Sequence, residues 1–115
     1  MITFICHAKV GPDNRSAFEA LLTRVRDLTR AHEAGVLYYD FSQSTEEPDT
    51  YVVIEVYRDA AAHAAHMETD WVKDSIPESR RLAEGRFDIR RYVSPEAAPA
   101  ADEGRLMSRS DTPGA

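Results

Sequence analysis

Residues 35–66 have the sequence GVLYYDFSQSTEEPDTYVVIEVYRDAAAHAAH, and this stretch decides the fold. Two runs rich in β-branched and aromatic residues, 36–43 and 50–57, are typical of strands. The segment between them, 44–49, is polar and contains a proline, so it predicts a turn. Because no helix intervenes, we expect the two strands to pair as an antiparallel hairpin.

The second strand of this hairpin has two unlike faces. Alternation places Val52, Ile54 and Val56 on one face, which is purely aliphatic. The opposite face mixes apolar bulk with a carboxylate and two phenols, from Tyr51, Val53, Glu55 and Tyr57. A short alanine-rich helix follows, from Asp59 as its N-cap to about Met67. It carries His63 and His66 on nearly the same face, so we expect both imidazoles near Glu55 and Tyr57.

Upstream of the hairpin, the chain predicts a strand and a long helix. Residues 2–10 alternate imperfectly between apolar and polar, as expected of a strand. Asp13 is the expected N-cap of the helix, and Gly35 is its expected end. The helix carries an apolar stripe at helical spacing, formed by Ala17, Phe18, Leu21, Leu22, Val25 and Leu28.

Downstream of the hairpin and its helix, a second helical stretch covers about residues 70–84. Pro77 must kink it or begin a new first turn there, because a proline nitrogen has no hydrogen to donate. A last strand is expected over 86–93. Apolar periodicity ends after Ser94, so we predict a domain over residues 1–94. The tail, 95–115, is expected to be disordered or ordered only by a partner subunit.

The element order β-α-β-β-α-β predicts an α+β, ferredoxin-like fold with one antiparallel sheet and helices on one face. Two helices cover only one face of such a sheet. The other face, with the aliphatic side of strand 50–57, would remain exposed, which is a liability in a monomer. We therefore predict a homodimer in which two sheets pack face to face.

Composition excludes several function classes. The chain has 115 residues, which suits one domain, and a net charge of −6, which argues against a nucleic-acid partner. No apolar run approaches the roughly 20 residues that cross a bilayer, so no membrane role is expected. The N-terminus lacks the features of a signal peptide, which makes the cytoplasm the expected compartment. The single cysteine, Cys6, is expected to be a small buried hydrophobe.

Three short motifs resemble the antibiotic biosynthesis monooxygenase superfamily, the dimeric α+β barrels. They are G-x-x-x-Y-D-x-x-Q in the first hairpin strand, E-x-[WY]-x-D in the second, and A-H-x-x-T in the short helix, followed by an aromatic residue. In this chain they are Gly35, Tyr39, Asp40 and Gln43; Glu55, Tyr57 and Asp59; and Ala65, His66 and Thr69, followed by Trp71. The resemblance covers about residues 1–94.

The resemblance implies several chemistries. Many members oxidise quinols or polycyclic phenols with molecular oxygen and without a metal or flavin. Others degrade haem, but the position aligned with their haem-ligating histidine is Ile76 here, which argues against haem of that type. A close branch isomerises a phosphorylated, sugar-derived diketone, which would need a cation such as Arg90 or Lys9. Some members have no established reaction, so a non-catalytic, small-ligand-binding dimer is a third hypothesis.

Our first hypothesis is a monooxygenase with molecular oxygen as co-substrate, no bound cofactor and a small quinol or phenol as substrate. His66 is the expected base, because an imidazole titrates near neutral pH, and Glu55 would orient it. Each also has a structural interpretation: His66 as a helix cap or a contact of Glu55, and Glu55 as the ion-pair partner of a late arginine. His63 is a weaker catalytic candidate, since helix histidines are more often exposed.

Four further residues are expected to line the substrate pocket. Tyr39, Tyr57 and Trp71 would stack or pack on an aromatic ring. His7 is polar in an otherwise apolar strand, and the haem-degrading branch of the superfamily has an asparagine at the matching position. No histidine pair has the spacing of a metal site, so none is predicted.

Overall fold

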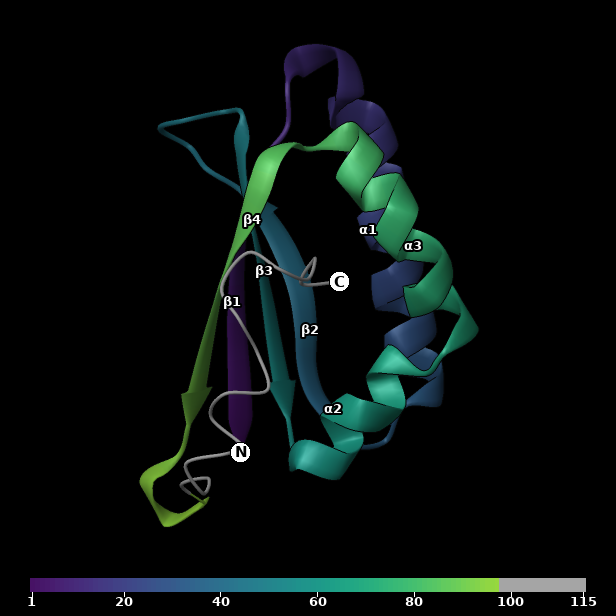
Figure 1. Cartoon of the computed structure of the whole chain (residues 1–115), viewed down its shortest axis with the longest axis vertical. Coiled ribbons are helices and arrows are strands. Elements are labelled where there is room, and N and C mark those ends of the chain that lie inside the picture. The colour runs from purple at the N-terminus through teal and green to yellow at the C-terminus, as the bar shows by residue number, and fades with distance from the viewer. Residues whose placement is uncertain (98–115) are drawn as a thin grey trace.

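The computed structural model describes residues 1–97, which form one antiparallel sheet with all of its helices on one side (Figure 1). The predicted ferredoxin-like order is confirmed. The elements are β1 (Ile2–Lys9), α1 (Arg15–His32), β2 (Val36–Gln43), β3 (Thr50–Tyr57), α2 (Ala60–Met67), α3 (Asp70–Leu82) and β4 (Glu84–Val93), with 3₁₀ turns at Pro12–Asn14 and Pro95–Ala97. Apart from the second of these turns, the predicted tail lies outside the described residues.

The strands lie in the order β2-β3-β1-β4, and every neighbouring pair is antiparallel. The hairpin β2-β3 is the one predicted from the sequence. The central strand β1 pairs with both β3 and β4, so the first and last strands of the fold are neighbours. No helix within residues 1–97 is long and apolar enough to cross a membrane.

The core lies between the sheet and the helices. On β3 the mixed face predicted from the alternation is buried beneath the helices, while Val52, Ile54 and Val56 lie on the opposite, partly exposed face. The buried face of β1 continues this layer, and Cys6 is buried there as expected. Helix α1 contributes a stripe with a spacing of three or four residues, formed by Phe18, Leu22, Val25 and Thr29.

The ends of α1 differ from the prediction. Asp13 lies within the first 3₁₀ turn, and Asn14 precedes the helix without a side-chain cap. The helix ends at His32 rather than at Gly35, and the backbone N–H of Glu33 donates to Thr29 O at 3.0 Å. Gly35 serves a different purpose, since a Cβ atom at that position would lie 2.6 Å from the Cβ of Ala62. Its missing side chain lets β2 begin directly against α2.

Pro77 lies inside α3 and does not begin a new helix, which corrects one of the two predicted outcomes. The carbonyl that loses its helical partner belongs to Lys73, and both residues are exposed, so water can take that hydrogen bond. Strand β4 starts at Glu84, earlier than predicted. Gly85 has a φ of 67°, beside a shift in the β1–β4 register between His7 and Lys9.

Candidate active site

His66 is the only residue of α2 that is fully buried. Its Nδ1 lies 3.0 Å and 3.1 Å from the two carboxylate oxygens of Glu33, which follows α1. Its Nε2 lies 4.0 Å from Oε1 of Glu55 on β3. The alanine-rich sequence of α2 allows this close approach, because small side chains leave the imidazole as the bulky group facing inward. His66 thus joins two carboxyl groups from distant parts of the chain.

Glu55 is a buried carboxyl group that carries a proton at neutral pH. Its side chain is 2% exposed, and the burial raises its pKa from 4.5 to about 8. The hydroxyl of Tyr57 donates a hydrogen bond to Oε1. Oε2 has no hydrogen-bond partner among residues 1–97. The protonated form avoids the large cost of a bare charge in the core.

Tyr39 lies directly across from Glu55 in the β2–β3 register. Burial raises the pKa of its phenol well above the ordinary value, and its hydroxyl accepts or donates no hydrogen bond within the described part of the chain. The rings of Tyr39 and Tyr57 each lie 5.4 Å from the imidazole of His66. Three of the predicted site residues, Tyr39, Glu55 and Tyr57, therefore lie around the predicted base.

His63 belongs to the same cluster but faces other partners. Its ring stacks on Phe4 at 4.4 Å and meets Tyr57 edge-on at 4.9 Å. Burial lowers its pKa from 6.5 to about 4, so it is neutral at physiological pH. His63 is therefore held as an aromatic neighbour of the cluster rather than as an exposed helix histidine.

Glu33 is the site residue that the sequence reasoning missed. Besides His66, it accepts a hydrogen bond from Nε1 of Trp71 at 3.2 Å, and the same indole N–H lies 3.3 Å from Oγ1 of Thr29. A glutamate just beyond the C-terminus of a helix meets the unfavourable end of the helix dipole. This unfavourable position was the only feature of the sequence that could have marked Glu33 as a site residue. In the folded protein, hydrogen bonds from Trp71 and His66 offset the cost of the charge.

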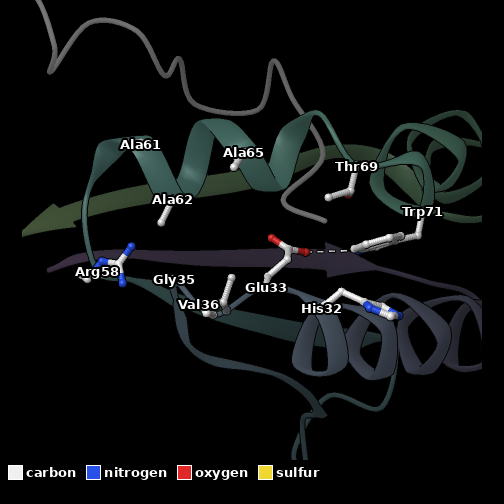
Figure 2. Close-up of a pocket in the computed structure, with 11 residues that line it drawn as sticks. His32, Glu33, Gly35, Val36, Arg58, Ala61, Ala62, Ala65, Thr69 and Trp71 are labelled. Atoms are coloured by element: carbon white, nitrogen blue, oxygen red, sulfur yellow. Dashed lines mark hydrogen bonds between the residues drawn. The ribbon is translucent and has the colours of Figure 1, made fainter.

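A cavity of about 400 Å³ opens between the end of α1, helix α2 and the start of α3. Figure 2 shows Glu33 near its middle, with the carboxylate bonded to Trp71. Of the predicted site residues, only Trp71 lines the cavity, and His66 is connected to it through its contact with Glu33. The lining residues are His32, Glu33, Ala34, Gly35, Val36, Arg58, Ala61, Ala62, Ala65, Thr69 and Trp71.

His7 is not brought together with the other predicted residues. It is exposed on the face of β1 that points away from the helices, because alternate residues of a strand face opposite sides of the sheet. There it borders a smaller hollow of about 190 Å³, together with Gln43 and Tyr51. The expectation that His7 shares a pocket with His66 is therefore wrong. Within residues 1–97, no three His, Cys, Asp or Glu side chains are grouped so as to hold a metal ion.

Residues 1–78 match the family of antibiotic biosynthesis monooxygenases. The chain belongs to this family. One similar protein is YcnE of Bacillus subtilis, which is named as a candidate monooxygenase. It is 29% identical over 89 residues, which cover 77% of this chain and 93% of YcnE. An uncharacterised Synechocystis protein, sll1783, is 29% identical over 84 residues, but the match spans only 56% of its length.

Solved structures of antibiotic biosynthesis monooxygenase candidates share the fold. One from Caulobacter crescentus superposes with a TM-score of 0.77 at 26% identity, covering 81% of this chain and 88% of that one. One from Nitrosomonas europaea gives a TM-score of 0.74 at 25% identity, covering 83% and 99%. Family, fold and these names together support a general monooxygenase assignment.

Proposed function

We propose that this chain is a cofactor-independent monooxygenase that oxidises a small phenol or quinol with molecular oxygen in the cavity beside Trp71. The observation that carries the proposal is the Glu33–His66 pair, whose carboxylate lines the cavity while its imidazole is fully buried. Membership of the monooxygenase family supports the reaction class.

The pair is built to accept one proton from a substrate hydroxyl. A substrate in the cavity meets Glu33 first, so the hydroxyl proton passes to that carboxylate. In the tautomer with hydrogen on Nδ1, His66 donates a hydrogen bond to this carboxylate, at 3.0 Å from Oε1 and 3.1 Å from Oε2. The imidazole thereby holds Glu33 in place and stabilises its charge before the proton arrives. His66 thus orients the proton acceptor, Glu33, which the sequence did not indicate.

Oxygen then reacts with the electron-rich phenolate. The phenolate transfers one electron to O₂, and the aryloxyl radical and superoxide combine at a ring carbon. The His66–Glu33 pair returns its proton to the peroxide. Loss of water, with the hydrogen from the same carbon, leaves a carbonyl, so one oxygen atom enters the quinone product and one leaves as water. The wall formed by Ala61, Ala62 and Ala65 is apolar and presents no side-chain group that could react with the radical pair.

Oxygen uptake with a panel of dihydroxynaphthalenes, naphthols and quinols tests the proposal. Glu33→Gln keeps the shape of the side chain but removes the proton acceptor, so we expect kcat/KM to fall by roughly 100-fold or more. Glu46→Gln makes the same chemical change in the exposed turn after β2 and should leave turnover unchanged. Absence of uptake across the panel, or full activity in Glu33→Gln, would sink the proposal.

The isomerase alternative needs a cation beside the substrate phosphate. Neither candidate from the sequence lines the cavity: Arg90 is paired with Asp88 at 2.9 Å on β4, and Lys9 borders a different hollow. Arg58 lines the cavity instead and keeps this alternative open. Proton exchange on a phosphorylated diketone without oxygen uptake would favour it. If both assays are negative, the non-catalytic binding dimer is the function that remains.

A further inference from the structure

Arg58 places a positive charge at the end of the cavity away from Trp71. It follows β3 directly, and its backbone N–H donates to Gly35 O at 2.9 Å, which fixes it beside the start of β2. Its Nη2 lies 3.5 Å from the point that a Cβ of Gly35 would occupy. Figure 2 shows the guanidinium at one end of the cavity, with the rings of His32 and Trp71 at the other.

The two ends of the cavity have opposite chemistry. Glu33 presents a carboxylate near Trp71, and Arg58 presents a guanidinium at the far end. Among the residues of the described chain that line the cavity, Arg58 is the only lysine or arginine. The wall between the two ends is small and apolar, formed by Ala34, Gly35, Val36, Ala61, Ala62 and Ala65. Such a wall accommodates a flat ring system.

The guanidinium of Arg58 is only weakly committed to its present partner. Its ion pair with Asp59 is 3.5 Å long, and the two side chains are 64% and 53% exposed. Exposed ion pairs of this kind contribute little to the stability of the folded protein. Asp59 has a second role that does not need Arg58, since its Oδ1 accepts from the backbone N–H of Ala62 at 2.8 Å and caps α2. Arg58 can therefore turn to a ligand at small cost, and its planar fork suits a carboxylate.

We infer that the substrate is a hydroxyarene that carries a carboxylate at the end away from its reacting hydroxyl, and that Arg58 is the specificity-determining residue for this acid group. The inference rests on the proposed function, because that function places the reacting hydroxyl at Glu33.

Binding of two hydroxyarenes under anaerobic conditions tests this assignment, because neither ligand can then be oxidised. 6-Hydroxy-2-naphthoate has a hydroxyl and a carboxylate at opposite ends, and 2-naphthol lacks only the acid. Trp71 is the only tryptophan of the chain, so its indole N–H gives a single NMR signal that reports on this cavity. We expect both ligands to shift that signal, with the naphthoate binding about 10-fold more tightly, as for one charge-assisted hydrogen bond.

Two variants test whether Arg58 causes the preference for 6-hydroxy-2-naphthoate over 2-naphthol. Arg58→Gln should bring the two affinities together by weakening naphthoate binding while leaving 2-naphthol binding unchanged. Arg24→Gln removes the same charge from an exposed position on α1 and should keep the 10-fold preference. Equal affinities in the unmodified protein, or a preference that survives Arg58→Gln, would overturn the inference. So would a failure of both ligands to shift the indole signal.

Two further arms separate this inference from the proposed function. Tighter binding of 2-naphthyl phosphate than of 6-hydroxy-2-naphthoate would assign Arg58 to a phosphate and overturn the carboxylate. An Arg58-dependent preference for the naphthoate without oxygen uptake from any hydroxyarene would uphold the acid-binding end of the cavity and reject the monooxygenase reaction.

Discussion

At the scale of single residues, Glu55 and His63 both contact Tyr57. Burial shifts their pKa values in opposite directions, raising that of Glu55 and lowering that of His63. The folded protein holds a proton on Glu55 from pH 4.5 to about 8, where the unfolded chain has lost it, so stability falls as pH rises. From pH 6.5 down to about 4, His63 stays neutral while the unfolded chain binds a proton, so stability falls as pH falls. Below pH 6.5 the contributions of Glu55 and His63 to the pH dependence of stability oppose each other. Above pH 6.5 only the contribution of Glu55, of these two, remains.

Glu55→Gln should therefore flatten the pH dependence of stability between pH 6.5 and 8. The amide is neutral at every pH and still accepts the hydrogen bond from Tyr57. We expect the free energy of unfolding to lose a downward slope of about 1 kcal/mol per pH unit. Urea unfolding at several pH values measures this slope. Glu46→Gln should keep the original slope, and identical slopes in Glu55→Gln and the unmodified protein would show that the pKa of Glu55 is not raised.

At the scale of elements, the position of α2 depends on Gly35. The strand β2 and the helix α2 approach so closely that a Cβ on Gly35 would lie 2.6 Å from the Cβ of Ala62. Backbone elements on both sides hold these atoms, so neither can yield easily. This contact sets the distance of α2 from the sheet, and through α2 it sets the position of His66 against Glu33.

Gly35→Ala should destabilise the protein by about 1–3 kcal/mol, the usual cost of overpacking. Ala62→Gly alone should cost about 1 kcal/mol, because glycine is a poor helix former. Combined, the two changes should cost less than their sum, since the second relieves the clash that the first creates. Urea unfolding of the single and double variants measures this coupling. Strict additivity would mean that α2 moves away from Gly35 without strain.

At the scale of the whole molecule, one face of the sheet has no cover from the described residues. All helices lie on the other side (Figure 1). The uncovered face carries Ile5 paired with Ile54 at its centre, and Tyr38 and Tyr92, which are 49% and 53% exposed, towards its edges. The homodimer through sheet faces expected from the sequence stays a prediction. The aliphatic centre of this face supports it, and the Arg90–Asp88 ion pair lies on the same face.

Ile54→Lys should shift the protein from dimer to monomer without unfolding it. A buried, unpaired ammonium at the centre of the interface is costly, whereas a lysine on a free monomer surface is not. Sedimentation velocity at micromolar concentration, with circular dichroism as the folding check, measures both. Ala64→Lys on the exposed side of α2 should leave the dimer intact. A monomer in the unmodified protein would contradict the prediction.

Much of the fold followed from local patterns in the sequence. Strand alternation predicted that Glu55 and Tyr57 would share one face of strand β3, and the polar segment 44–49 predicted the hairpin turn. These signals are reliable because a strand repeats every two residues and a helix every 3.6, whatever surrounds them. Element ends were less well predicted. Pro77 lies within a continuous helix, because solvent on its exposed side can satisfy the carbonyl that it leaves unpaired.

The sequence by itself determined the element order, the two faces of each strand and the family resemblance. Only the tertiary structure decided which side chains meet. Glu33 and His66 are 33 residues apart, and Arg58 reaches the same cavity from a third segment. His7 has the chemistry of a site residue but lies on the wrong face of the sheet. Periodicity places a side chain on a face, whereas its neighbours depend on how separate elements pack through space.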